Sequence, residues 1–315
     1  MLLSLVIPCY NEEGNVTRFY NEVTRVFSNS DFDYEFVFVD DGSKDKTFSE
    51  LRELHKNDTR VRVFSFSRNF GKEAAMYAGL KNSHGDAVCI IDADLQQSPE
   101  VVLEMLSHMK EDETLDCIAA YQEKRKENKL ISGVKSIFYK IINKISDVDF
   151  VSGASDFRLM KRKMVDAIIE MSEFHRFSKG IFGYVGFNTK FIPYTVQKRE
   201  VGKTKWSVGK LLKYALDGIF SFSTAPLKIS TCIGFLSSLS SIIYLIVVII
   251  QKLAYGIAVP GYATIVVLLL FIGGIQLFCL GIMGEYIAKM YVQVKNRPIY
   301  VMRCELDSTK DEKND

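Results

Sequence analysis

The chain lacks the cysteine patterns of metal clusters and disulfide frameworks. Its six cysteines stand at positions 9, 89, 117, 232, 279 and 304, and no two of them form a Cys-x-x-Cys pair. The four histidines, at positions 55, 84, 108 and 175, are equally dispersed. The sequence therefore offers neither a zinc cluster nor a Cys-His catalytic pair, and we expect the cysteines to be reduced packing residues.

A strong excess of charge is also missing. The formal net charge is +2, and no basic stripe with interleaved aromatic residues occurs, so we expect no nucleic-acid partner. The stretch from Met1 to Pro8 has no basic region and is too short for a signal peptide. We predict that it forms a first strand and that the bulk of the protein stays in the cytosol.

Charged residues are absent from two long stretches towards the C-terminus. None occurs from Ile229 to Gln251, and after Lys252 none recurs until Glu285. Because an uncharged apolar stretch of about 20 residues spans a bilayer as a helix, we predict transmembrane helices at about 229–251 and 262–288. The alternative is a buried hairpin in a soluble core, which would need surrounding core residues that the rest of the sequence does not supply.

Basic residues flank this pair of apolar segments on the outside. Lysines 205, 210, 213 and 228 precede the first segment and Lys289, Lys295, Arg297 and Arg303 follow the second, whereas only Lys252 lies between them. We therefore expect both termini on the cytoplasmic side of the plasma membrane. Residues 1–228 are predicted to form a cytosolic domain, 229–288 the membrane hairpin and 289–315 a cytosolic tail, disordered after Arg303 because Asp, Lys and Glu dominate there.

Apolar runs of strand length recur in the first part of the chain, separated by stretches of helical length and periodicity. They lie at Leu3–Ile7, Tyr34–Val39, Val61–Ser65, Ala87–Ile91 and Leu115–Ala119. This alternation is typical of βαβ units, so we predict an α/β domain with a mostly parallel sheet. Ligands bind such sheets beyond the carboxyl ends of the strands, and polar clusters follow three of these runs.

The stretch Asp92–Gln97, after the fourth run, is the most informative part of the sequence. A strand that ends there delivers two carboxylates and an amide to one point. Hard oxygen ligands suit Mg²⁺ or Mn²⁺, so the stretch indicates a site for a cation and a diphosphate. The alternative is a solvated acidic turn, which the other motifs of the chain make less favoured.

A second polar cluster, Asp40–Ser43, follows the second run. Asp41 has the chemistry to accept a hydrogen bond from a uracil N–H or a ribose hydroxyl, and Gly42 permits a tight turn close to a ligand. Ser43 and Asp45 equally fit a structural role as caps of the following helix.

A third cluster follows the first run. Pro8, Tyr10 and Glu12 have the residue types to cradle a base and its ribose. The structural alternative is that Asn11 and Glu12 begin an ordinary helix. Each cluster alone is a weak indication, but the three together, in this order, are a strong one.

These motifs together resemble the inverting glycosyltransferases of family 2. The resemblance lies in Val6–Glu12, Val39–Ser43, Ser67–Lys72 and Asp92–Gln96. It implies the nucleotide-diphospho-sugar-binding α/β fold called GT-A. Within the family, Asp156–Met160, Arg199–Trp206, Phe222–Leu227 and the paired C-terminal spans are similar to the polyprenyl-phosphate glycosyltransferases.

The resemblance implies a role for each matching residue. The nucleotide sugar is expected to contact Pro8, Tyr10, Glu12, Asp41, Lys72 and Asp92, and Mg²⁺ or Mn²⁺ to bind Asp94 and Gln96 with Asp92. Asp94, Asp156 and Arg158 are the expected catalytic residues. Relatives commonly have arginine in place of Tyr121 and Asp-x-Gly in place of Gly153–Ser155, so Lys124 and Arg125 are candidate substitutes at the acceptor phosphate.

Two segments outside the spans, at about 130–147 and 207–222, carry a helical apolar stripe accompanied by lysines. Such helices suit the headgroup layer of an anionic membrane, although a surface helix packed on the domain has the same periodicity. We expect a lipid phosphate to meet the domain near Arg158, Arg199, Lys203 and Lys205, since arginine and lysine both bind phosphate. Lys203 and Lys205 fit the neutralisation of anionic lipids equally well.

The expected reaction is the inverting transfer of a hexose from a UDP-sugar to undecaprenyl phosphate, for modification of cell-envelope glycans. UDP-glucose is the favoured donor and UDP-N-acetylglucosamine the runner-up. A phosphate monoester with a second pKa of about 6 is largely ionised in the cytosol. Asp156 is therefore expected either to orient Arg158 or the sugar hydroxyls, or to act as a base if the phosphate arrives protonated.

Three other functions fit the sequence less well. A processive polysaccharide synthase usually has a Gln-x-x-Arg-Trp motif and more spans, and the sequence shows neither. The complete set of site residues argues against a non-catalytic sugar-nucleotide sensor, and the lack of ionisable residues in the middle of the spans argues against a flippase or channel. Gly274 and Gly281 fit a helix-packing face, which would serve either a homo-oligomer or the hairpin itself.

Overall fold

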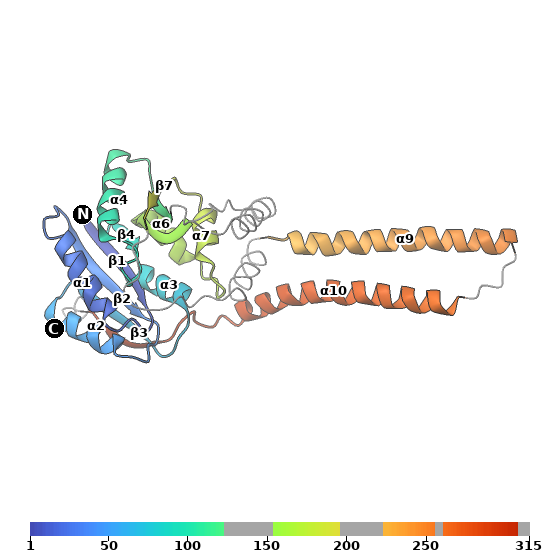
Figure 1. Ribbon diagram of the computed structural model, residues 1–315, viewed down its shortest axis with the longest axis horizontal. Coiled ribbons are helices and arrows are strands. Elements are labelled where there is room, and N and C mark those ends of the chain that lie inside the picture. The colour runs from blue at the N-terminus through green and yellow to red at the C-terminus, as the bar shows by residue number, and fades with distance from the viewer. Residues whose placement is uncertain (123–153, 196–222, 256–260, 308–315) are drawn as a thin grey trace.

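The computed structural model describes residues 1–122, 154–195, 223–255 and 261–307. It consists of an α/β domain from which a hairpin of two long helices projects (Figure 1). The elements in chain order are β1 Leu2–Cys9, α1 Asn15–Val26, β2 Asp33–Asp40, α2 Thr47–Asn57, β3 Val61–Phe66, α3 Lys72–Asn82, β4 Ala87–Ile90, α4 Pro99–Glu111, β5 Cys117–Gln122, β6 Ala154–Lys161, α6 Arg162–Glu170, α7 Ser178–Tyr184, β7 Thr189–Tyr194, α9 Ala225–Tyr255, α10 Tyr262–Val294 and β8 Met302–Leu306.

A mixed sheet forms the centre of the domain, with the strand order β7-β5-β6-β4-β1-β2-β3-β8. The pairs β1–β2, β1–β4, β2–β3 and β5–β7 are parallel. β6 is antiparallel to both of its neighbours, and β8 is antiparallel to β3. The prediction of an α/β domain with a mostly parallel sheet is thus confirmed, and β6 and β8 are the strands that run against the rest.

The central strands are buried on both faces, which explains their nearly continuous apolar sequences. In β2, Phe36 and Phe38 belong to the core on one face, and Val37 and Val39 belong to the core on the other. The first core also contains residues of α1, α2 and α4, and the second contains residues of α3, α6 and α7. Because helices cover both faces, a ligand has access only at the edges of the sheet.

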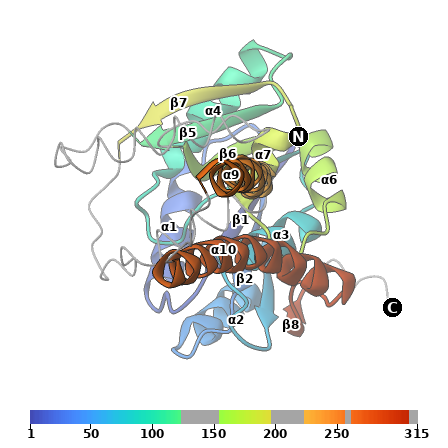
Figure 2. The same cartoon turned by 90° about the vertical axis from the view of Figure 1, so that its right-hand side faces the viewer.

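The hairpin consists of α9 and α10, which run side by side away from the domain (Figures 1 and 2). The segments suited to crossing a membrane are Ala225–Ala254 and Val267–Val294, and the most apolar window of each has no buried residue. Phe235 and Leu270, for example, are 67% and 71% exposed. This exposure excludes the alternative of a hairpin buried in a soluble core, and the length and composition suit two membrane spans.

Two hydrogen bonds join α10 to α9 and to the segment just before it, at the end of the hairpin nearer the domain. Tyr286 Oη donates a hydrogen bond to the carbonyl of Ser223 at 2.6 Å, and Cys279 Sγ lies 3.7 Å from the carbonyl of Ser230. An added Cβ at Gly274 or Gly281 would meet no atom within 4 Å. Packing of α9 against α10 therefore does not depend on these glycines, and the homo-oligomer stays a prediction.

The predicted disorder after Arg303 is wrong for Cys304–Asp307. β8 pairs with β3, and the ring of Tyr300 stacks on Phe66 with a centroid distance of 4.8 Å. The carboxylate of Asp307 accepts hydrogen bonds from Nε and Nη2 of Arg62 at 2.8 and 2.7 Å. Residues 308–315, like the predicted interfacial helices at 130–147 and 207–222, lie outside the described part of the chain.

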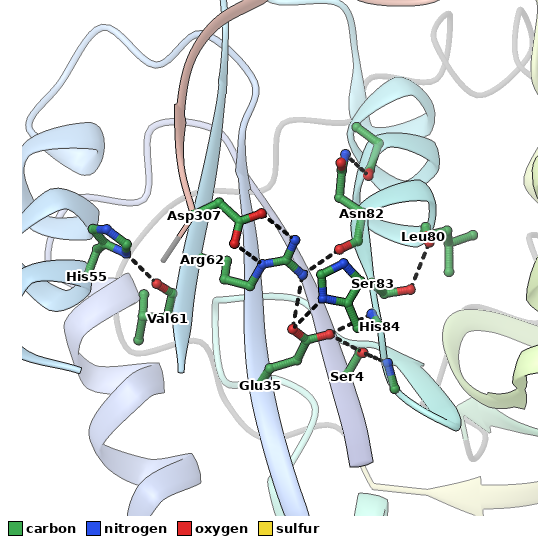
Figure 3. Close-up of polar contacts among 12 residues, drawn as sticks. Ser4, Glu35, His55, Val61, Arg62, Leu80, Asn82, Ser83, His84 and Asp307 are labelled. Atoms are coloured by element: carbon green, nitrogen blue, oxygen red, sulfur yellow. Dashed lines mark hydrogen bonds and ion pairs between the residues drawn. The ribbon is translucent and has the colours of Figure 1, made fainter. Parts of the chain in front are cut away.

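Arg62 is the centre of a buried polar cluster at the amino ends of the strands (Figure 3). Besides Asp307, its Nη1 donates to Glu35 Oε2 at 3.0 Å and to the carbonyl of Asn82 at 2.5 Å. Glu35 Oε1 in turn accepts from Ser4 Oγ at 2.5 Å. These groups satisfy one another, so this edge of the sheet is tied together by polar bonds, and the polar residues predicted to bind a ligand lie at the opposite edge.

Candidate functional site

The turn after β4 presents the predicted metal ligands. Ala93 is buried, whereas Asp92, Asp94 and Gln96 are half-buried. Leu95 has a φ of 55°, and this left-handed residue folds the turn so that Gln96 N donates to Asp94 Oδ1 at 3.1 Å. The turn therefore brings the Asp94 carboxylate and Gln96 together.

Gln97, which was not predicted as a site residue, forms two hydrogen bonds with Asp92. The buried Gln97 accepts a hydrogen bond from Asp92 N at 2.9 Å, and its Nε2 donates to Asp92 Oδ2 at 3.3 Å. The amide side chain thus fixes both the backbone and the carboxylate of Asp92. In the sequence, Gln97 has no feature that distinguishes it from the adjacent Gln96.

The donor set of this turn fits Mg²⁺ or Mn²⁺. Two carboxylates and one amide are hard oxygen ligands. Within the described ranges, no group of three His, Cys, Asp or Glu side chains is close enough to hold a metal ion by itself. Mg²⁺ usually takes one or two carboxylates and completes its shell with water and phosphate oxygens, so the residue types of this turn are compatible with an ion that binds together with a diphosphate.

Lys72 joins the β4 turn to β6. Its Nζ lies 2.6 Å from Asp92 Oδ1 and 3.3 Å from Asp156 Oδ2. Burial alone would lower the pKa of Lys72, but the charges of Asp92 and Asp156 outweigh it and raise the pKa. The ammonium is therefore protonated at every physiological pH. Lys72 is the first residue of α3, so the positive end of this helix faces the same point.

Asp156 lies near the start of β6. Burial raises its pKa, but the positive charges of Lys72, Lys179 and Arg158 have the larger combined effect, and the pKa ends below its ordinary value. The carboxylate is therefore ionised at neutral pH. Its Oδ1 is buried and accepts no hydrogen bond from any group in the described part of the chain. This oxygen is free to accept a hydrogen bond from a substrate hydroxyl.

Arg158, on the same strand, is buried and lies against the ring of Phe182. Its guanidinium carbon lies 3.6 Å from the ring centroid of Phe182 on α7, and its Nη2 donates to the carbonyl of Ser155 at 2.9 Å. The residue is 4% exposed, and burial lowers its pKa. The predicted contact between Arg158 and a lipid phosphate would therefore need a movement of Phe182.

The loops that follow β1 and β2 are bonded to each other. Asn11 N donates to Ser43 Oγ at 3.0 Å, and Glu12 N donates to Thr47 Oγ1 at 2.8 Å. Of the two predicted helix caps, Asp45 accepts a hydrogen bond from Thr47 N, at the first residue of α2, whereas Ser43 binds the other loop instead. The polar clusters after β1 and β2 thus meet at the carboxyl edge of the sheet, and the third cluster follows β4 at the same edge, because β4 pairs in parallel with β1.

Pro8, Tyr10 and Glu12 stand at this edge as expected. Pro8 pairs with Val39 near the end of β1, and Tyr10 and Glu12 are half-buried in the loop that follows. Glu12 Oε2 accepts from Asn15 Nδ2 at 2.7 Å, where α1 begins. This contact supports the helix-start alternative for Glu12, and the nucleotide contact stays a prediction.

Asp41 holds the loop that leads to Lys72. Its carboxylate accepts from Phe70 N at 2.6 Å and from Gly71 N at 2.9 Å. Burial raises the pKa of Asp41 to about 6 against the opposing effect of these two hydrogen bonds. Gly42, with a φ of 65°, lies so close that an added Cβ would stand 2.4 Å from the carbonyl carbon of Arg68. The Asp41–Gly42 pair therefore sets the position of α3.

Two further residues beside the site were missed by the sequence analysis. Glu73 accepts hydrogen bonds from the backbone and the hydroxyl of Ser178 at the start of α7. Burial, and then the charge of Asp156, raise the pKa of Glu73 to about 7. Tyr194 ends β7, where burial raises its pKa and the charge of Asp92 adds to the effect. Their sequence context is that of an ordinary helix start and strand end.

The acceptor side of the site is described only in part. Tyr121 lies in β5, opposite Ala154 of β6. The other predicted phosphate-binding residues, Lys124, Arg125, Arg199, Lys203 and Lys205, lie outside the described residues.

Comparison with known proteins agrees with this architecture. The profile of glycosyl transferase family 2 matches residues 4–169, more than half of the chain, and the profile described as the GtrB C-terminal hairpin matches residues 225–290. The Bacillus subtilis glycosyltransferase CsbB is 41% identical over 96% of this chain and 91% of its own. The bactoprenol glucosyl transferase of Shigella phage SfII is 39% identical over 96% of this chain and 98% of its own.

Among solved structures, one match covers much of the chain at low sequence identity. The glucosyl-3-phosphoglycerate synthase of Mycobacterium tuberculosis overlaps 70% of this chain and 77% of its own, with a TM-score of 0.46 and 17% identity. On the family profile and the near full-length similarity to glycosyltransferases, the chain is a glycosyltransferase of GT-A fold that belongs to glycosyl transferase family 2.

Proposed function

We propose that this protein transfers glucose from UDP-glucose to undecaprenyl phosphate at the cytosolic face of the plasma membrane, with inversion at the sugar C1. The observation that carries the proposal is the meeting of Asp92, Lys72 and Asp156 beside the Asp94–Gln96 turn. The exposed apolar hairpin supports a lipid acceptor. The name of the bactoprenol glucosyl transferase relatives supports both the sugar and the carrier.

The donor nucleotide binds at the carboxyl edge of the sheet. Pro8, Tyr10 and Glu12 contact the uridine, and Asp41 secures the loop around it. Lys72 approaches the diphosphate or the sugar, because its ammonium stands between the two carboxylates at that edge. UDP-N-acetylglucosamine is the alternative donor, since a few hydroxyl contacts decide between the two sugars.

Asp94 and Gln96, with Asp92, would hold Mg²⁺ or Mn²⁺. The ion would supply positive charge against the negative charge that develops on the departing diphosphate. Gln97 keeps the Asp92 carboxylate oriented through its hydrogen bonds. Lys72 adds a fixed positive charge near the same phosphates, which favours departure of the leaving group.

The attacking group is an oxygen of the lipid phosphate. As the C1–O bond to the diphosphate breaks, its electron pair leaves with the diphosphate, and the phosphate oxygen forms the new bond from the opposite face. The phosphate needs little deprotonation because its second pKa is about 6. Asp156, whose pKa is lowered, is a fixed anion that orients the sugar hydroxyls and keeps Lys72 in place.

The acceptor reaches the site from the membrane side. Its tail stays in the bilayer beside α9 and α10, and its phosphate meets Arg199, Lys203 and Lys205, with Lys124 and Arg125 as further contacts. Arg158 joins them when Phe182 moves off its guanidinium. The basic residues that flank the hairpin support a topology with both termini in the cytoplasm.

The test is a panel of UDP- and GDP-sugars incubated with the purified full-length protein and undecaprenyl phosphate. We expect a glucosylated lipid from UDP-glucose, whose anomeric configuration, read by NMR, is opposite to that of the donor. Transfer of another sugar would correct the donor, and retention at C1 would contradict the mechanism. A protein that binds UDP-glucose but transfers no sugar to the lipid would contradict the proposed function.

A further inference from the structure

The chain that follows the membrane hairpin reaches the donor side of the site. In the pairing of β8 with β3, Ser65 lies opposite Cys304 and Phe66 lies opposite Met302. The register shifts between these pairs, so Arg303 is an extra residue on β8. Such a bulge turns a side chain away from the regular direction of the strand. The side chain of Arg303 bonds to Ser65, at the carboxyl end of β3.

Arg303 compensates a buried carboxylate. Its Nη2 donates to Ser65 Oγ at 2.8 Å and lies 3.7 Å from Asp40 Oδ2, and Ser65 Oγ donates to the same Oδ2 at 2.7 Å. The guanidinium also stacks over Phe48 at 4.8 Å from the ring centroid. Asp40 has no exposed surface, and a buried carboxylate needs hydrogen bonds and a counter-charge.

Asp40 in turn holds the turn that begins the donor-binding loops. Its Oδ1 accepts from Ser43 N at 2.9 Å, and Ser43 Oγ accepts from Asn11 N at 3.0 Å. Asp41, the residue that follows Asp40, fixes the loop that leads to Lys72. A continuous series of hydrogen bonds therefore runs from Arg303 through Ser65, Asp40 and Ser43 to the loop after β1.

We propose that Arg303 is a positioning residue for the nucleotide donor. By neutralising Asp40 it keeps the Asp40–Ser43 turn in the conformation that binds UDP-sugar, so a residue beyond the membrane hairpin is part of the support of the donor site. The inference rests on the proposed function only in naming the bound group as a nucleotide sugar.

The test compares Arg303→Gln with the wild-type full-length protein in detergent. The variant loses a hydrogen bond and an ion pair that hold the donor-binding turn. We therefore expect the Kd of UDP, measured by calorimetry with Mn²⁺, to rise roughly tenfold. The KM for UDP-glucose should rise in parallel, while kcat and the KM for undecaprenyl phosphate stay within about twofold. Arg297→Gln removes the same charge from an exposed position of the same segment and should change none of these values.

A second variant separates positioning from a general loss of structure. Asp40→Asn in the Arg303→Gln background removes the charge that Arg303 compensates, while the amide oxygen still accepts from Ser43 N. We therefore expect this double variant to recover most of the lost UDP affinity, and Arg303→Lys to retain part of it.

Equal UDP affinity in Arg303→Gln and wild type would overturn the inference, as would a fall in kcat without a change in donor KM or a failure of Asp40→Asn to restore binding. If the wild type transfers sugar normally and Arg303→Gln binds UDP equally well, this inference alone fails. If Arg303→Gln binds UDP more weakly than the wild type, but the wild type transfers no sugar to lipid, the proposed function fails and the inference stands.

Discussion

The Nζ of Lys72 lies 3.3 Å from Oδ2 of Asp156. In the chain, β4, α4 and β5 lie between these two residues. The same Nζ lies 2.6 Å from Asp92 Oδ1. One ammonium thus joins the start of α3, the turn after β4 and the start of β6. Removal of this charge would leave the carboxylates of Asp92 and Asp156 without the cation that joins them, so the arrangement of the site depends on Lys72.

Lys72→Met is therefore expected to lower kcat/KM for sugar transfer by roughly a hundredfold, the usual loss when a fixed charge that stabilises a leaving group is removed. Steady-state kinetics on the purified protein measure the effect. Lys81→Met, in the last turn of the same helix and exposed, is the matched control and should retain full activity. Equal activity of the two variants would show that Lys72 takes no part in catalysis.

Asp156→Asn tests whether this carboxylate is a base. Its pKa is lowered, so Asp156 stays ionised as the pH falls towards 5 and does not create an acidic limb there. A limb near pH 6 is expected from the lipid phosphate instead. We predict that Asp156→Asn lowers kcat on the order of a hundredfold and leaves the shape of the pH–rate profile unchanged.

The exposed Asp166→Asn on α6 serves as its control and should behave as wild type. An acidic limb that disappears in Asp156→Asn, but not in Asp166→Asn, would instead identify Asp156 as the general base.

Gly42→Ala tests the close packing that positions the loop before Lys72. Its Cβ would stand 2.4 Å from backbone of Arg68, and its φ of 65° already disfavours alanine. Gly14 has a similar φ of 78°, but a Cβ there meets no atom within 4 Å. Gly14→Ala should cost only about 1 kcal/mol of stability, whereas Gly42→Ala should cost more and also weaken UDP binding. Equal thermal shifts and equal UDP affinity would show that the approach to Arg68 is not needed.

Asp307→Ala tests whether the C-terminal strand is part of the domain. It leaves the guanidinium of Arg62 buried, with Glu35 as its remaining charged partner among the described residues (Figure 3). Breaking a buried ion pair usually destabilises by about 3–5 kcal/mol. We expect a clear fall in the urea midpoint of the detergent-solubilised protein. Glu53→Gln, which removes an exposed ion pair with Lys56, should leave the midpoint unchanged, and the same result for Asp307→Ala would contradict the structure of this segment.

The sequence predicted the parallel core because β1 to β4 have local apolar patterns that few other structures produce. β8 was missed for the opposite reason. Met302–Leu306 is a short edge strand with Arg303 and Glu305 at alternate positions, and its pairing partner β3 lies far away in the sequence. Composition indicates a polar tail there, and only the distant partner makes it a strand.

In the site, too, local patterns were predictable from the sequence and contacts between distant segments were not. The Asp92–Gln97 turn was visible because the strand before it is apolar and the residues after it are acidic. Lys72 was expected to approach the nucleotide, but its pairing with Asp156 depends on β6 running antiparallel beside β4. Likewise, the contact of Glu73 with Ser178 joins two helices whose sequences give no sign of each other.

The central claim is metal-dependent glucose transfer at the Asp92–Gln96 turn. Its most direct test measures the transfer of radiolabelled glucose from UDP-glucose to undecaprenyl phosphate. Purified wild type and Asp94→Asn are compared, each with Mn²⁺ and with chelator. We predict label in the lipid for wild type with Mn²⁺, loss of transfer on chelation, and a rate at least about a hundredfold lower in Asp94→Asn. Transfer that proceeds equally with chelator, or equally in Asp94→Asn, would contradict the account.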